Sequence, residues 1–480
     1  MGTGKRRASH VWQSAIGSVC LFAGILTSSV AGLADTVAQK SVSQYGITWE
    51  FDREYTTGRF ANGDWWVLGP VTITRITPDF DGRKNGWEVN PAVNGKQGLH
   101  AGADFDSSLV PSLPYTARGT VSIVKTVASG REMPLIKTAA VLTVVETAPE
   151  ADGSAVFRPP YVGTEKPFYR VADLKTGLLP AYPPVSPMPT LASIEQTFSG
   201  LRLDHKDGAI GRALRPQDSM SDYQPANTPA YNEGALRLMV NDDIKEKMPA
   251  LIKYIQHGID KIHTIYLGQT WPDGGGHQPG HRIVPAFTAV LLDLPHAKQM
   301  LREATFFHGS RWFWRGKNGM VLWGQPSSEK AYWDYIIAGR GNRSNRDPYG
   351  YIDGGKVTEG AYQVITSQAH KGEILATILM PALKEAWNPV EWQMVKEYVE
   401  RWVSVGQWAQ PDPIAPYDGK PENYGVTYGP DPKHAGQPIP GAGRFPEAHG
   451  THKDGGQYRS AFVAAMWDAY KEKAEKGGVR

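Results

Sequence analysis

The sequence predicts an α+β protein of several domains, in which a β-sandwich-like N-terminal domain precedes an all-α domain built as an (α/α) toroid or as helix pairs. Three observations support this fold class. An apolar leader opens the chain, short alternating segments separated by turn residues follow it, and apolar residues recur at helical spacing from about Tyr231 onward.

Residues 1–34 are typical of a secretory signal peptide. Basic residues at 5–7 precede a mainly apolar stretch at 15–33, and Gly32-Leu33-Ala34 offers a small-residue cleavage site. An uncleaved membrane anchor is the alternative, but Gly, Ser and Thr residues dilute the apolar stretch. We therefore expect an exported protein, periplasmic or extracellular, with no membrane association after the signal is cleaved.

Composition excludes several classes of chemistry. The single cysteine, Cys20, lies in the leader, so the mature chain is expected to contain neither a disulfide nor a nucleophilic or zinc-binding thiolate. Without the three basic residues of the leader, 48 Lys and Arg match 48 Asp and Glu, and no basic stripe is visible, so nucleic acid is not expected as a partner. The 15 Trp and 21 Tyr suit the apolar faces of sugars, although many of these rings must belong to the core.

Residues 45–148 are expected to form the β-sandwich-like domain. Apolar and β-branched residues alternate or cluster in short segments, and Asn-Gly and Asp-Gly pairs supply turns between them. The clearest strand candidates are 47–51, 71–74, 121–124 and 139–145.

Residues 149–230 are rich in Pro, Gly, Ser and Asp, and they predict a long connection across the surface. Short helices are expected near 190–200 and 208–214. A flexible linker is the alternative interpretation.

Residues 231–480 are expected to form the helical domain. Pro249 can start a helix that places Ile252, Ile255, Ile259, Ile262 and Tyr266 on one face, and Pro389 can start another that carries Trp392, Val395, Val399 and Trp402. Further helices are predicted at 283–293, 296–307, 328–338, 359–370, 372–386 and 457–472. Seven or eight helices separated by Gly-rich and Pro-rich loops favour antiparallel pairs, arranged as a curved toroid or as a bundle.

The densest group of candidate functional residues is the loop at 271–282. Trp271 and Asp273 precede three glycines, and His277, His281 and Arg282 follow them just before a predicted helix. The glycines let the backbone approach a ligand, and the imidazoles and the guanidinium can bind an anion. The alternative is a Gly-rich loop with one or two exposed histidines.

Other candidates are more scattered. Asp-Gly-Gly recurs at 353–355 and 454–456, and these turns could share one rim with the loop at 271–282, although each can equally be an Asx turn or a cap. Asn232 stands where it could cap a helix, and Gln368, His370 and Lys371 stand at the end of a predicted helix. The remaining candidates are two tyrosines that can carry protons, a basic loop, and a histidine close to His452 and Asp454: Tyr335, Tyr362, Arg340, Arg343 and His449. No recognised metal-ligand spacing is met.

The combination of an exported chain, a β-rich domain, a helical region and a loop of His, Arg and aromatic residues resembles the toroid-type polysaccharide lyases of the alginate and heparinoid group. The resemblance covers residues 231–480 most directly. The Asn-Asn-His motif of alginate lyases is missing, because Glu233 and Gly234 follow Asn232. The β domain also comes first here, whereas it follows the helices in many such enzymes.

The resemblance implies β-elimination on a uronate-containing polysaccharide. Asn232, His277 and Arg282 would hold the uronate carboxylate, and Tyr335, Tyr362 or His281 would move the proton. We expect His277→Ala to abolish turnover while the fold stays intact. The substrate-binding candidates are Trp271, Asp273, Arg340, Arg343, His370 and His449.

Two alternatives stay open. One is a glycoside hydrolase with a carboxylate pair, either Glu233 with Asp273 or Asp273 with Asp353. The other is a non-catalytic glycan-binding or cell-envelope scaffold, which predicts no titratable group in the site that is both desolvated and close to a charge partner. The expected partner is a polysaccharide. No cofactor is assigned, and assistance by a calcium ion is left open.

Overall fold

The computed structural model describes residues 36–102, 104–272, 276–307, 312–315, 321–325, 354–355, 361–405 and 458–477. The described residues all belong to one compact unit, Ala34–Arg480. The leader and the helix expected at 328–338 lie outside the described residues. In the part of the chain that is described, no helix is both long enough and apolar enough to cross a lipid bilayer.

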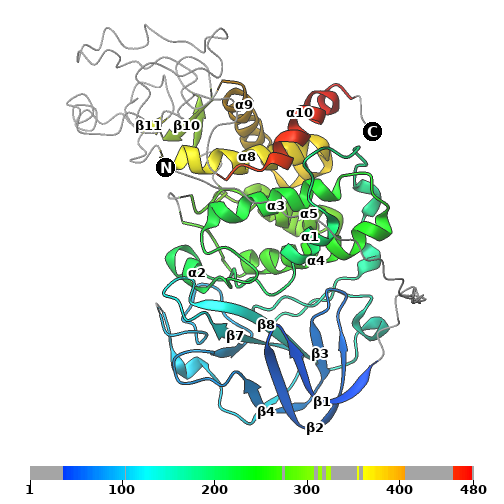
Figure 1. The fold of residues 1–480 in the computed structure, drawn as a ribbon, viewed down its shortest axis with the longest axis vertical. Coiled ribbons are helices and arrows are strands. Elements are labelled where there is room, and N and C mark those ends of the chain that lie inside the picture. Colours follow the sequence, from blue (N-terminus) through cyan, green and yellow to red (C-terminus); the bar gives the residue numbers. More distant parts are fainter. Residues whose placement is uncertain are drawn as a thin grey trace, which may run out of the picture. The chain divides into compact units, whose positions relative to one another are not determined.

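The N-terminal part is a single curled sheet of eight strands with mixed strand directions (Figure 1). Strands β3 and β8 pair in parallel, and the remaining pairs are antiparallel. The order is β5-β7-β8-β3-β2-β4-β6, with β1 on β2. The strands are β1 (Val37–Gln44), β2 (Ile47–Arg59), β3 (Trp65–Leu68), β4 (Val71–Thr77), β5 (Trp87–Val89), β6 (Tyr115–Ala117), β7 (Val121–Ala128) and β8 (Ile136–Val145).

All four strand candidates lie in strands, but the expected sandwich of two sheets is replaced by one curled sheet in the described residues. The thirteen-residue strand β2 explains the difference, because it pairs with β1, β3 and β4. Its register shifts against both β1 and β4, and such bulges bend a strand and increase its twist. The curl lets one sheet enclose a core around Trp49, Trp87 and Ile123.

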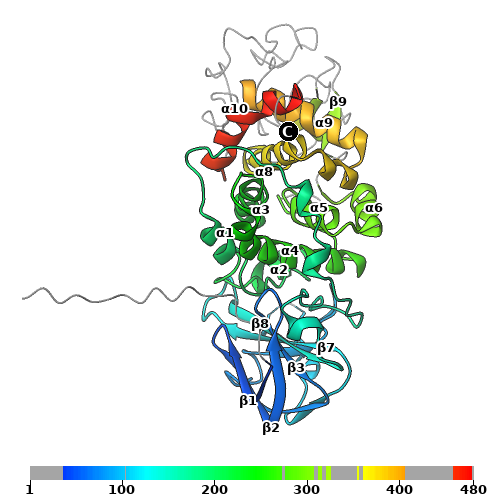
Figure 2. The same cartoon turned by 90° about the vertical axis from the view of Figure 1, so that its right-hand side faces the viewer.

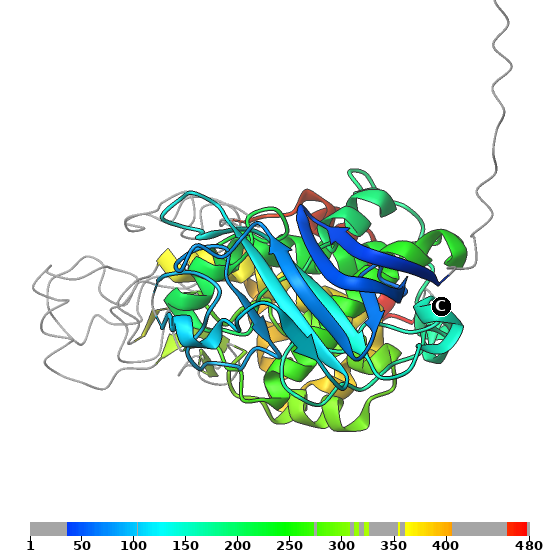
Figure 3. The same ribbon diagram turned by 90° about the horizontal axis from the view of Figure 1, so that it is seen from below.

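The outer face of β7 and β8 is covered as well. Val124 and Val141 of these strands form a second apolar cluster with Tyr161, Leu201 and Leu203 from the segment that follows the sheet. This cluster brings residues 201–206 into the layer between the sheet and the helices. Figure 3 is viewed from the sheet side and shows the strands, blue to cyan, in front of the helices.

The connection at 149–230 is ordered and contains the two short helices that the sequence predicts, α1 (Leu191–Thr197) and α2 (Gly208–Leu214). It also contains the 3₁₀ turns η2 (Glu150–Gly153), η3 (Val171–Asp173) and η4 (Thr176–Leu178); η1 (Ser107–Leu109) lies earlier, between strands. The next helix, α3 (Gln224–Leu238), begins before Tyr231. Asn232 is therefore in a helix interior, and its expected role as a cap is wrong.

Nine α-helices follow the sheet within the described residues. Besides α1 to α3 they are α4 (Ile244–Tyr266), α5 (Ile283–Leu291), α6 (Pro295–Glu303), α8 (Ala361–Leu379), α9 (Pro389–Val405) and α10 (Ala461–Glu475). The 3₁₀ helix η6 (Pro381–Ala386) follows α8, and a small sheet contains β9 (Phe313–Arg315), β10 (Val321–Gln325) and β11 (Gly354–Gly355). Figure 2 shows α4 on the side of the helical region next to the sheet.

Two predicted helix ends are wrong for identifiable reasons. Helix α4 begins at Ile244, where the Asp243 carboxylate accepts a hydrogen bond from the Lys245 amide, and Pro249 lies inside the helix. Helix α8 runs through Gly372 as one helix, where the sequence predicts two. A Cβ on Gly372 would lie 2.2 Å from Cγ of Asn232, so this glycine allows α8 to pack closely against α3.

The helices pack in neighbouring pairs. Helix α4 contacts α5 and α1, and α8 contacts α3, α9 and α10. Gly258 of α4 faces Thr288 of α5, where a Cβ would lie 1.9 Å from the threonine hydroxyl. The helical character of this region is thus confirmed.

Candidate functional site

A cluster of six buried polar side chains lies where the segment around residues 201–206 packs against helices α3, α4 and α5. We call this cluster the polar centre, and none of its six residues is more than 2% exposed. Its members are Asp204, before α2; Arg215, after α2; Gln224 and Tyr231, in α3; Lys261, in α4; and His281, before α5. Burying so many polar groups is costly unless their interactions are satisfied, so their arrangement needs a specific explanation.

Lys261 is the hub of the polar centre. Its Nζ lies 2.5 Å from Oδ2 of Asp204 and 2.6 Å from Nδ1 of His281. The same ammonium lies 5.2 Å from the ring centroid of Tyr231 and 5.0 Å from that of Trp271. Burial lowers the pKa of Lys261 to about 8, against the opposing attraction of Asp204. Near neutral pH, a fraction of the Lys261 amine is therefore unprotonated and able to accept a proton.

The contacts of His281 fix its tautomer. Its Nδ1 faces two donors, Nζ of Lys261 and, at 3.2 Å, Nε2 of Gln224. Because both neighbours donate, Nδ1 is the acceptor and the ring proton is on Nε2. Burial, followed by the charges of Lys261 and Arg215, lowers the pKa of His281 well below its usual value. The neutral ring stacks on Trp271 with a centroid distance of 3.9 Å.

The polar centre contains more positive than negative charge. A terminal nitrogen of Arg215 lies 3.6 Å from Oδ1 of Asp204, which also binds Lys261. Arg202 is 5% exposed, and its charge opposes the burial that raises the pKa of Tyr231. Among the described residues, Asp204 is the only carboxylate in contact with Lys261, Arg215 or His281. Two cations, Arg215 and Lys261, thus share one carboxylate.

Several polar atoms in and beside the polar centre have no hydrogen-bond partner among the described residues. They are Nε of Arg202, Oδ1 of Asp204, Nε of Arg215, Oε1 of Gln224, Nε2 of His257, Nε1 of Trp271 and Nε2 of His281. The Tyr231 hydroxyl makes no hydrogen bond of standard geometry there either. Burial and then the charge of Asp204 raise its pKa, while Arg202 and Arg215 oppose them. Unpaired buried polar atoms are uncommon in proteins, and the several that gather here are free to bind a water molecule, an ion or a ligand group.

Of the residues that the sequence singled out, three lie in or beside this centre. Trp271 and His281 are buried within it. His277 is half-buried, and burial followed by the charges of Arg215 and Arg212 lowers its pKa, so it lies on the Arg215 side.

Asn232 and His370 lie in the helical interior. Nδ2 of Asn232 donates to the Ala369 carbonyl at 3.1 Å, which joins α3 to α8. His370 is buried in α8, with Nδ1 3.6 Å from a carboxylate oxygen of Glu373. It is inside the helix, so the expectation that residues 368–371 end a helix is wrong.

Arg282 is adjacent to His281 but forms different contacts. Its guanidinium lies 2.8 Å from Glu391 and donates to the carbonyls of Leu301 and Ala386 at 3.0 and 3.3 Å. It also lies over the ring of Trp387 at 4.3 Å. These contacts join α5 to α6, η6 and α9, so the structure gives Arg282 a packing role.

The remaining candidates are not described. Asp273, Tyr335, Arg340, Arg343 and His449 lie outside the described residues, and so do Asp353 and the turn at 454–456. Tyr362 belongs to α8, but its side chain is outside the described set. A shared rim of the three Asp-Gly-Gly turns therefore stays a prediction. In the described part of the chain, no group of three His, Cys, Asp or Glu residues could hold a metal ion.

No sequence pattern singles out four members of the polar centre, Asp204, Arg215, Gln224 and Lys261, and Tyr231 stands out only at the expected start of the helical region. One sequence feature could have pointed to this site. His257 and Lys261 are two titratable residues four positions apart, so they lie on the same side of a helix that also has an apolar stripe. The other partners come from the connection at 149–230, and only the fold brings them to α4.

We also compared the chain with known proteins. No protein-family model, no curated protein and no solved structure matches it.

Proposed function

We propose that the chain is an exported polysaccharide lyase that cleaves a uronate-containing polysaccharide by β-elimination, with the polar centre as its catalytic site. The observation that carries this proposal is the sharing of one buried carboxylate by Arg215 and Lys261, with the guanidinium of Arg202 beside Tyr231. Buried cations without a matching anion are unfavourable. A substrate carboxylate would supply the missing charge.

The reaction needs a group that stabilises charge on the uronate carboxylate and a base for the proton on the adjacent carbon. In our proposal Arg202 and Arg215 hold the carboxylate. The unprotonated amine of Lys261 accepts the proton, and the electron pair of that carbon–hydrogen bond forms a carbon–carbon double bond. The bond to the leaving oxygen breaks, and the Tyr231 hydroxyl gives that oxygen a proton.

The other members of the centre act on Lys261 in this scheme. Asp204 and His281 hold the amine from two directions, at 2.5 and 2.6 Å. The amide nitrogen of Gln224 donates a hydrogen bond to Nδ1 of His281, so this nitrogen stays unprotonated. The proton from the substrate therefore goes to Lys261 and not to His281. The depressed pKa of Lys261 is the property that a base working near neutral pH requires.

Two observations favour the lyase over the alternatives. The polar centre offers an amine base beside a cation, which β-elimination uses, and its described ion pairs include one carboxylate, Asp204, where a hydrolase at this centre would need two. The hydrolase pairs that include Asp273 lie outside the described residues. A non-catalytic scaffold predicts no desolvated titratable group beside a charge partner, and Lys261 with Asp204 is such a pair.

We infer that the leader is removed, that the protein works in the periplasm or outside the cell, and that its partner is a polysaccharide. We also infer that the helix pairs curve into an (α/α) toroid. The packing of α4 on the next helix, α5, is the kind of pair from which such a ring is built.

The test is incubation with a panel of uronate-containing polysaccharides while ultraviolet absorbance and reducing ends are followed together. A lyase raises both signals, a hydrolase raises only the reducing ends, and a binding protein raises neither. Lys261→Met should abolish both signals. The matched control is Lys245→Met, which removes the same charge from an exposed position of the same helix. Full activity of Lys261→Met would remove the polar centre from the mechanism.

A further inference from the structure

An open hollow lies where two loops of the curled sheet meet, and it shares no residue with the polar centre. One loop joins β4 to β5, and the other joins β5 to η1. The hollow has about 480 Å³ of space, within the ~300–1,000 Å³ that is typical of ligand sites. We call it the loop hollow. It is lined by Gly82, Arg83, Ala101, Gly102 and Phe105.

Hydrogen bonds hold the two loops in place without any ligand. The Asp81 carboxylate accepts hydrogen bonds from the amides of Arg83 and Lys84, at 2.9 and 2.6 Å. The Ala101 amide donates to the Arg83 carbonyl at 2.6 Å, and this bond joins one loop to the other. The walls of the loop hollow are therefore preformed, so a ligand that enters it does not have to order them.

Two glycines bring backbone polar groups to the wall. Because a glycine has no side chain, Gly82 and Gly102 line the loop hollow with main-chain atoms alone. Both residues are exposed, and neither amide donates a hydrogen bond to another residue of the described part of the chain. The two amides are thus free to donate to oxygen atoms of a ligand, such as those of sugar hydroxyls.

Arg83 supplies the positive charge of the loop hollow. Its side chain is exposed and forms no ion pair with a carboxylate in the described ranges. The acids nearby are engaged elsewhere. Asp79 and Asp106 form ion pairs with other side chains, each at 3.0 Å, and Asp81 accepts from the two loop amides. The charge of Asp104 stabilises the ammonium of a lysine outside the two loops. The Arg83 guanidinium can therefore hold a ligand carboxylate with two parallel hydrogen bonds.

We propose that the loop hollow binds a uronate unit of a polysaccharide, apart from the reaction site. The carboxylate meets Arg83, and the sugar hydroxyls accept hydrogen bonds from the amides of Gly82 and Gly102. The half-buried ring of Phe105 packs against the apolar face of the sugar. The choice of a uronate polymer rests on the proposed function, whereas the binding of a sugar acid does not.

A second attachment point changes how a polymer binds. Once one unit of the polysaccharide lies in the loop hollow, the rest of the same chain is held at a high local concentration around the protein. The loop hollow should therefore strengthen the binding of a long polymer and leave the chemical step at Lys261 unchanged.

The experiment is a titration of the full chain with glucuronate, glucose and inorganic sulfate, followed by ligand-detected nuclear magnetic resonance. Glucuronate has no glycosidic bond to cleave, so it reports binding alone. Arg83→Met should weaken glucuronate binding about tenfold, as expected for the loss of a bidentate charged pair. Phe105→Leu keeps an apolar side chain but removes the ring, and it should weaken binding about fivefold. Glucose and sulfate should each bind more weakly than glucuronate, because each lacks one half of the contacts.

Arg118→Met is the matched control. It removes the same charge from an exposed position in the turn between β6 and β7, outside the loop hollow, and it should bind glucuronate as the wild type does. Lys261→Met should keep the part of the binding that depends on Arg83. Thermal unfolding of each variant verifies the fold.

Unchanged binding in Arg83→Met, an equal loss in Arg118→Met, or glucose or sulfate binding as tight as that of glucuronate would overturn the proposal. This outcome is separable from that of the proposed function. Glucuronate binding that depends on Arg83 would establish the loop hollow even if no polysaccharide is cleaved. Cleavage that depends on Lys261, without glucuronate binding at Arg83, would establish the reaction site alone.

Discussion

The Lys261 amine and the His281 imidazole share a hydrogen bond of 2.6 Å, and neither side chain is exposed to solvent. The contact couples the two groups, because a proton on Lys261 makes a second positive charge on His281 unfavourable. Asp204, at 2.5 Å, stabilises the protonated amine. Substitutions at this site should therefore change proton transfer as well as stability.

Tyr231→Phe tests the proposed proton donor. The variant loses only a hydroxyl that makes no standard hydrogen bond with a described residue, so the free energy of unfolding should change by about 1 kcal/mol or less. Polysaccharide cleavage should fall at least about 100-fold, as expected for the loss of a general acid. Denaturant unfolding and initial rates measure the two effects. A variant that cleaves at the wild-type rate would contradict the role of Tyr231.

The buried Lys261 predicts a pH dependence of stability. Its pKa is about 8 in the folded chain and near its usual 10.5 in the unfolded chain. Between these values the unfolded state binds more protons, so the free energy of unfolding should rise with pH, by at most ~1.4 kcal/mol per unit from this group. Below about pH 8 the amine is protonated in both the folded and the unfolded state, so this group no longer contributes a slope.

Lys261→Met should lack this contribution. The difference in unfolding free energy between wild type and variant should therefore shift in favour of the wild type from about pH 8 to pH 10. Subtracting the two curves removes the titration of groups that the proteins share. Parallel curves across that range would show that Lys261 titrates normally.

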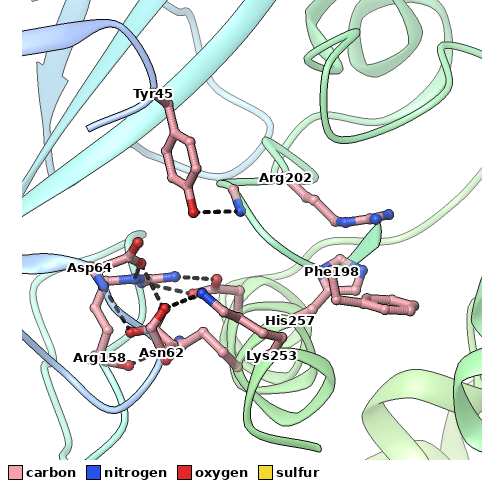
Figure 4. A pocket seen from close by; sticks show the side chains of 11 residues that line it. Tyr45, Asn62, Asp64, Arg158, Phe198, Arg202, Lys253 and His257 are labelled. Carbon is pink, nitrogen blue, oxygen red and sulfur yellow. Dashed lines mark hydrogen bonds and ion pairs between the residues drawn. The ribbon is translucent and has the colours of Figure 1, made fainter. Parts of the chain in front are cut away.

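The buried ion pairs of Arg158 with Asp64 and Asp260 should be essential for holding the sheet against α4 (Figure 4). Arg158→Met leaves Asp64 and Asp260 buried without their cation and should lower the free energy of unfolding by about 3–5 kcal/mol. Arg170→Met is the control, because its ion pair with Glu150 is exposed and should contribute less than about 1 kcal/mol. Similar losses in the two variants, measured by chemical denaturation, would argue against this account.

Arg282→Met separates packing from catalysis. The loss of the buried pair with Glu391 should destabilise the chain by about 3–5 kcal/mol. Activity per folded molecule should nevertheless stay near the wild-type value, because the Arg282 guanidinium contacts α6, η6 and α9. Activity lost at a temperature where the variant is fully folded would return Arg282 to the reaction.

Local patterns in the sequence were enough to predict much of the fold. The stripe of Ile255, Ile259 and Ile262 correctly indicated α4, and the four strand candidates all lie in strands. The ends were harder to predict, because Pro249 fits inside α4 and Gly372 continues α8 through a close contact with Asn232. The single curled sheet depends on how β2 divides its pairing among three partners, which the alternation of side chains does not encode.

The site was predictable only in part for the same reason. The glycines and histidines at 271–282 marked a candidate loop, and His281 and Trp271 do lie in the polar centre. Asp204 and Lys261 are 57 residues apart, and neither stands in a recognisable motif. Their contact depends on the packing of residues 201–206 between the sheet and α4, a relationship that becomes visible only in three dimensions.

The most direct test of the central claim is mass spectrometry of the fragments that the wild-type chain releases from a uronate polysaccharide in isotopically labelled water. β-Elimination breaks the chain without adding water. We therefore predict an unsaturated uronate end and no solvent oxygen in either fragment when the reaction is stopped before the new reducing ends exchange their anomeric oxygen with the solvent. One labelled oxygen at each cleavage would show hydrolysis and contradict a lyase centred on Lys261 and Tyr231.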